Sequence, residues 1–219
     1  MRMRLLAVSL SLFAMGATAC APTPPPPPAG PVVLSEGHVD AFGVAVEDGE
    51  FFVHIHDEEN DVEYLPSQAI LQAKPETETT VPAGPNFGFL GTPGSPVWVL
   101  PQTETPGVLY AGWASEEIAP GVLLGDVLNW NLISVSGPGS FAVYNTDGFG
   151  VPTVIFDSDN SLPQQTTFPA GAHVHGNWAF SAAGTYTINF SATGSLADST
   201  PLDSGPKAFT FVVGPYPPA

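Results

Sequence analysis

Basic residues are scarce in this chain, whose 219 residues include 4 Lys and Arg against 21 Asp and Glu. Arg2 and Arg4 lie near the start, so the rest carries only Lys74 and Lys207 against all 21 acidic residues, a formal charge near −19. Proteins that bind nucleic acid need clustered Lys and Arg to contact phosphates. The composition therefore excludes nucleic acid as a partner, whereas an acidic surface is compatible with binding cations.

Long apolar runs are also missing, and the run from Leu5 to Met15 is too short to span a bilayer, which takes about 20 residues. Together with the basic start and the small residues that follow, this run predicts an export signal peptide at 1–19. We expect the mature protein to lie outside the cytoplasmic membrane.

Cysteine occurs once, as Cys20, directly after the predicted signal peptide. The arrangement resembles the lipobox of bacterial lipoproteins, with Ala17 where leucine is usual. An ordinary Ala-x-Ala cleavage site followed by a chance cysteine is the alternative. Because a lone exported thiol is open to oxidation or stray pairing, we expect Cys20 to be lipidated and to anchor the protein to the membrane at the cell surface.

The rest of the chain divides into three predicted parts. Residues 20–33 contain the lipidated cysteine and a proline-rich tether, either stiff polyproline II or a flexible leader. Residues 34–214 form a single domain, and 215–219 a short tail. Short alternating stretches separated by turn signals predict an all-β fold for the domain. We expect an antiparallel β-sandwich, immunoglobulin-like or jelly-roll-like, with few helices.

All five histidines fall into three short clusters: His38 in GHVD, His54 and His56 in HIHDE, and His173 and His175 in HVHG. In a strand, residues i and i+2 project to the same side about 6 to 7 Å apart, so one metal ion can accept both imidazoles of a His-x-His pair. Isolated polar residues on exposed strand faces are the plainer interpretation. The clustering favours a metal site.

The turn around Asp48-Gly49 predicts a two-residue hairpin that pairs Val46 with Phe51, Val44 with Val53 and Phe42 with Ile55. This register puts those apolar residues on the core side. It also puts His38 and Asp40 on the core side, and His54 and His56, opposite Gly43 and Ala41, on the outer side. A bulge would reverse the relation between the two groups.

A second hairpin is predicted from HVHGNWAF to TYTINFSA, with Trp178, Phe180, Tyr186, Ile188 and Phe190 pointing inward. His173 and His175 then share the other face. Two arrangements follow. Either His54, His56, His173 and His175 form one four-imidazole site, which requires adjacent strands, or His173 and His175 meet His38 and Asp40 at the sandwich rim.

Zinc is the first candidate metal, because it takes four ligands from His, Asp or Glu when thiolates are absent; copper and nickel also suit imidazole. The acids that follow HIH, from Asp57 to Glu63, are expected to form a solvated loop that can also support the histidines or add oxygen ligands.

Four segments together resemble the actinobacterial surface-anchored domain called the choice-of-anchor M domain: GHVD, FGFLGTPGSPVWVLPQTETPGVLYAGW, GPGSFAVY and HVHGNWAFSAAGTYTINFSA. The resemblance covers Gly37 to Gly214. It implies a surface protein of a metal-acquisition or metal-handling system, partnered by an ABC transporter or its binding protein. His38, His173 and His175 match the family's histidine positions, whereas His54 and His56 are an addition in this chain or an unrelated exposed pair.

Catalytic motifs are absent: the sequence has no G-x-S-x-G elbow, no H-E-x-x-H helix and no phosphate loop. We therefore expect a binding protein rather than an enzyme, with a metal-dependent hydrolase as the remaining catalytic hypothesis. The other alternative is an adhesion or carbohydrate-binding module without metal. Trp98, Trp113 and Trp130 are expected in the core, and an aromatic platform for sugars is their functional alternative.

Overall fold

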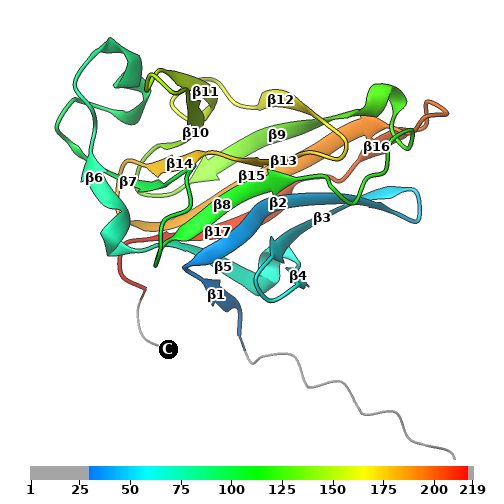
Figure 1. Ribbon diagram of the computed structural model, residues 1–219, viewed down its shortest axis with the longest axis horizontal. Helices are drawn as coiled ribbons and strands as arrows, with labels where there is room; N and C mark the ends of the chain where they lie inside the picture. The colour runs from blue at the N-terminus through cyan, green and yellow to red at the C-terminus, as the bar shows by residue number, and fades with distance from the viewer. Residues whose placement is uncertain (1–29, 217–219) are drawn as a thin grey trace, which may run out of the picture.

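The computed structural model describes residues 30–216 (Figure 1). The predicted signal peptide, Cys20 and most of the proline-rich tether lie outside the described residues. The first strand, β1 (Val32–Leu34), includes Val32 and Val33, which the sequence analysis assigned to the tether.

The domain is an all-β sandwich, as predicted, built from three sheets. The first, called the large sheet, also contains parallel pairs, because β5 runs parallel to both of its neighbours, so the sandwich is mixed rather than purely antiparallel. In order, its strands are β1, β5 (Ala69–Ala73), β17 (Lys207–Val213), β15 (Gly184–Ser195), β9 (Val127–Ser136) and β12 (Gln164–Pro169), with β16 (Pro201–Asp203) paired to β15.

The second sheet, called the histidine sheet, carries all five histidines. Its order is β13 (His173–His175), β8 (Leu109–Ala114), β2 (Gly37–Glu47), β3 (Glu50–Asp57) and β4 (Val62–Tyr64). The third, small sheet has the order β11 (Pro152–Asp157), β10 (Phe141–Thr146), β14 (Asn177–Phe180), β7 (Pro96–Leu100) and β6 (Glu78–Thr80).

Helical structure in the described part is limited to short 3-10 turns, in agreement with the sequence analysis. They are η1 (Pro66–Gln68), η2 (Pro75–Thr77), η3 (Pro85–Leu90) and η4 (Leu124–Asp126). None of the helices among residues 30–216 has the length and apolar character needed to cross a membrane.

Trp130 of β9 lies at the centre of one core shared by the three sheets. Its ring stacks on Phe42 of the histidine sheet at 4.9 Å and meets Trp178 of the small sheet at 5.6 Å. Trp113 and Trp130 are buried, as predicted, and Trp98 is half-buried against the same core. These three tryptophans thus pack as core aromatics, which leaves the sugar-platform hypothesis without support from them.

The β2–β3 hairpin begins in the predicted register and then departs from it. Val46 pairs with Phe51 and Val44 with Val53, but a bulge follows, where Ala41 and Phe42 stand opposite the single residue Ile55. Beyond it, Asp40 pairs with His56 instead of Ala41.

The extra residue reverses the side on which the preceding side chains lie. Val39 and Phe42 belong to the buried core, and Asp40 lies on the other side of the sheet, together with His56. The prediction that His38 and Asp40 face the core is therefore wrong, because the turn fixes the register only up to the bulge.

The predicted second hairpin is also wrong in its pairing. β14 pairs with β10 and β7, and β15 pairs with β9 and β17, so the connection passes from the small sheet to the large sheet. The inward parity is correct, since Trp178, Phe180, Tyr186 and Ile188 are fully buried. Alternation along a strand identifies its core side but not its neighbour.

Candidate metal centre

Strand order in the histidine sheet brings distant histidines together, because β8 lies between β13 and β2 (Figure 1). β8 pairs antiparallel with β13 and parallel with β2, which aligns Asp40, Gly112 and His175 in one row across the sheet. His38 lies in the neighbouring row, opposite Tyr110. Residues 135 positions apart in the chain thus meet on one side of the sheet.

The Nε2 atoms of His38, His173 and His175 converge into a triangle. They lie 2.9 Å apart between His38 and His173, 3.1 Å between His173 and His175, and 2.9 Å between His175 and His38. All three side chains are half-buried, so the triangle lies at the rim of the domain, where solvent reaches it.

Three mutual hydrogen bonds cannot explain this triangle. Each imidazole nitrogen has a single site, which is either a proton or a lone pair, so it cannot donate to one neighbour and accept from the other. Three lone pairs aimed at one point repel, and protons aimed there clash. One cation at the centre satisfies all three nitrogens together.

Asp40 supplies a fourth ligand atom. Its Oδ1 lies 3.2 Å from Nε2 of His173, and its side chain is only 1% exposed. This oxygen has no hydrogen-bond partner. Burial, followed by the hydrogen bond and the charge of Glu58, raises the pKa of Asp40 to about 7. A buried carboxylate oxygen without a donor is costly unless a cation or a proton occupies the site.

The four atoms fit tetrahedral coordination. Ligands bound to zinc at ~2.0–2.1 Å in a tetrahedron lie ~3.3 Å from one another. The three nitrogen separations and the Asp40–His173 distance, 2.9 to 3.2 Å, are close to that edge. One ligand atom from each of the four residues lies within 4.8 Å of all the others. The cluster can therefore hold a metal ion.

Neighbouring groups orient the imidazoles. Nδ1 of His173 lies 2.9 Å from the carboxylate of Glu116, which places the proton on Nδ1 and leaves the Nε2 lone pair free for a metal. Tyr110 stacks on His175 with ring centroids 3.5 Å apart and planes 7° apart. Burial, followed by the charge of the other two histidines, lowers the pKa of His175 to about 4. The ring is therefore neutral, as a metal ligand must be, at pH 7.

Gly112 makes room for the ligands. A Cβ at this position would lie 2.8 Å from Oδ1 of Asp40 and 2.9 Å from Cε1 of His175. Because Gly112 stands between these residues in the row, the absence of a side chain lets them approach across β8.

His54 and His56 lie apart from the triangle, because β8 and β2 separate β3 from β13. His54 contacts Glu117 through Nε2 at 3.1 Å, and His56 contacts Glu58 through Nδ1 at 3.0 Å. The four-imidazole arrangement requires adjacent strands and is therefore not formed. Of the two arrangements left open by the sequence, the structure has the one in which His173 and His175 meet His38 and Asp40.

Three residues around the triangle escaped the sequence analysis: Tyr110, Gly112 and Glu116. The acidic pair in the segment ASEEIAP was a visible signal, but only the pairing of β8 with β13 puts it beside a histidine. Glu58 was among the acids expected to support the histidines, and it contacts both Asp40 and His56.

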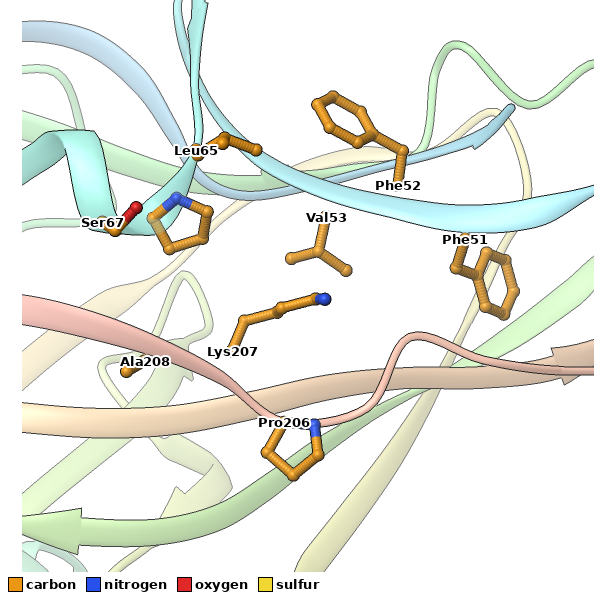
Figure 2. A pocket seen from close by; sticks show the side chains of 9 residues that line it. Phe51, Phe52, Val53, Leu65, Ser67, Pro206, Lys207 and Ala208 are labelled. Carbon is orange, nitrogen blue, oxygen red and sulfur yellow. The ribbon is translucent and has the colours of Figure 1, made fainter. Parts of the chain in front are cut away.

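An apolar cavity of about 320 Å³ lies elsewhere, between β3, η1 and β17. Figure 2 shows Val53 and Lys207 pointing into it, whereas Phe52 points to the other side of β3. None of its lining residues is a histidine or an acid. This cavity is therefore no part of the metal centre.

Comparisons of the chain with protein-family models, with curated proteins and with solved structures give no match. The resemblance to the choice-of-anchor M domain stays a prediction.

Proposed function

We propose that this protein binds a transition-metal ion at the cell surface, with zinc as the first candidate and copper as the second. The observation that carries the proposal is the triangle of His38, His173 and His175, whose Nε2 atoms lie 2.9 to 3.1 Å apart. Asp40 completes a set of three nitrogens and one oxygen, which suits borderline metals.

Four protein ligands favour capture over catalysis. A catalytic zinc site keeps one position open for water or substrate, whereas Asp40 lies where the fourth ligand is expected. The half-buried imidazoles leave the ion a route from solvent, and the acidic surface raises the local cation concentration. A role in metal acquisition or handling accounts for both features.

The cellular setting of this proposal comes from the sequence. A lipid on Cys20 and the following tether hold the domain outside the membrane, and the resemblance names an ABC transporter or its binding protein as the partner. In this scheme the protein binds the ion at the surface and passes it to the transport system.

Elemental analysis and calorimetric zinc titration of the purified protein test the metal site. We expect one tightly bound ion in the wild type and its loss in His173→Ala and His175→Ala. His56→Ala is the matched control, because it removes an imidazole on the same side of the sheet but outside the triangle. With Cu²⁺, electron paramagnetic resonance should report three coordinated nitrogens.

The adhesion alternative makes the opposite prediction. If the His173 and His175 variants keep the ion, or if the wild type binds none at pH 7, the metal-capture proposal is wrong.

A further inference from the structure

We propose that the histidine sheet holds a second divalent-cation site, formed by Nε2 of His54 and the carboxylates of Glu63 and Glu117. These three residues come from β3, from β4 and from the segment that follows β8. One ligand atom from each lies within 4.8 Å of the other two. This second cluster shares no residue with the triangle and does not depend on it.

His54 is built into the sheet, unlike a histidine on a solvated face. Its side chain is 2% exposed and stacks on Phe52 with ring centroids 5.2 Å apart. The ring lies over Gly43, where a Cβ would come within 2.5 Å of Nε2. Only a glycine opposite His54 in the register leaves room for this position.

The nitrogens of this buried ring have no partner outside the cluster. Nδ1 makes no hydrogen bond, and Nε2 points at Glu117, 3.1 Å away. Burial lowers the pKa of His54, so the ring is neutral and its Nε2 is available as a ligand. A buried polar ring aimed at two carboxylates has the arrangement of a metal ligand.

The carboxylates around His54 have no basic side chain to neutralise them. The two lysines of the described region lie elsewhere: Lys74 pairs with Glu36 at 3.1 Å, and Lys207 lines the apolar cavity. Burial, followed by repulsion from Glu63, raises the pKa of Glu117. A divalent cation between the carboxylates converts this repulsion into attraction.

One imidazole and two carboxylates define the class of ion. Mixed nitrogen and oxygen ligands suit Mn²⁺, Co²⁺ and Zn²⁺, with the remaining positions filled by water. Glu117 is 45% exposed, so this ion exchanges more readily than the one at the triangle. Glu116 contacts His173 and Glu117 contacts His54, so a single turn carries one acid to each site.

The stoichiometry of Zn²⁺ and Mn²⁺ binding to the full chain tests this proposal by equilibrium dialysis with elemental analysis. We expect two Zn²⁺ per chain in the wild type and one in the double variant Glu63→Gln, Glu117→Gln. The matched control is Glu76→Gln with Glu78→Gln, which removes two exposed carboxylates from another part of the surface and should leave two ions. Circular dichroism confirms that each variant folds.

Variants of the two sites separate this inference from the proposed function. His173→Ala should lose the tighter ion and keep the weaker one, and Cu²⁺ bound to that variant should show one coordinated nitrogen. If the triangle binds nothing but the Glu63 and Glu117 variant still loses an ion, the second site stands alone. A single ion in the wild type that survives the loss of Glu63 and Glu117 overturns it. So does an equal loss in the Glu76 and Glu78 control, which would indicate adsorption to the acidic surface.

Discussion

Gly112→Ala tests whether the spacing across β8 creates the metal centre. The new methyl group would lie 2.8 Å from Oδ1 of Asp40 and 2.9 Å from Cε1 of His175, where ordinary contacts begin at 3.4 Å. Each group must therefore move by about 0.5 Å, which uses up the tolerance of about 0.5 Å within which site residues must be held. The carbonyl of Val174, 3.0 Å away, prevents the backbone from absorbing the strain freely.

We expect zinc affinity to fall about 10- to 100-fold, the range seen when groups supporting metal ligands are disturbed, or about 1.4–2.7 kcal/mol. Competition with a chromophoric chelator at pH 7 measures this loss, and urea unfolding of the apo protein reports the separate cost of crowding. Gly148→Ala is the neutral control, because a Cβ there has nothing within 4 Å. Wild-type affinity in a folded Gly112→Ala protein would refute the argument that Gly112 sets the ligand geometry.

Three further substitutions probe the same centre. Asp40→Asn should weaken zinc binding yet stabilise the apo protein at pH 8: a raised folded-state pKa of about 7 means that ionised Asp40 costs stability as the pH rises from about 4 to 7, as urea unfolding would show. The lowered pKa of His175 makes its contribution complete above pH 6.5 and lost as the pH falls towards about 4, so His175→Gln should flatten apo stability between pH 7 and pH 5; an unchanged slope would contradict that assignment. Glu116→Gln should lower zinc affinity about 10-fold in the chelator assay by removing the carboxylate beside Nδ1 of His173, and no change would show that this contact does not orient the ring.

Local patterns in the sequence predict the fold class and the core side of most strands. Asp48-Gly49 fixes the start of the β2–β3 hairpin, and alternation identifies Trp178 and Ile188 as inward residues. Partners of strands are a different matter, because β14 and β15 have matching parity but lie in different sheets. Which strands become neighbours depends on the packing of the whole core around Trp130, and no local signal contains that information.

The site was predictable in its residues but not in its grouping. His38, His173 and His175 stand out by spacing and composition, and Asp40 by its place beside the first cluster. The bulge at Ala41 decides on which side of β2 the first cluster lies, and it has no turn residue to announce it. Gly112 has meaning only once β8 lies between the ligands.

β13 is a three-residue strand at the margin of its sheet, held by a ladder to β8 alone. Such short margins open readily, and their free backbone groups can recruit a strand from another molecule. An ion bound to His173 and His175 on one side and to His38 on the other would clasp this margin to β2, two strands away. Loading and release of the cargo would then also lock and free the border of the sheet, and hydrogen exchange at residues 173–175 would follow the metal content of the protein.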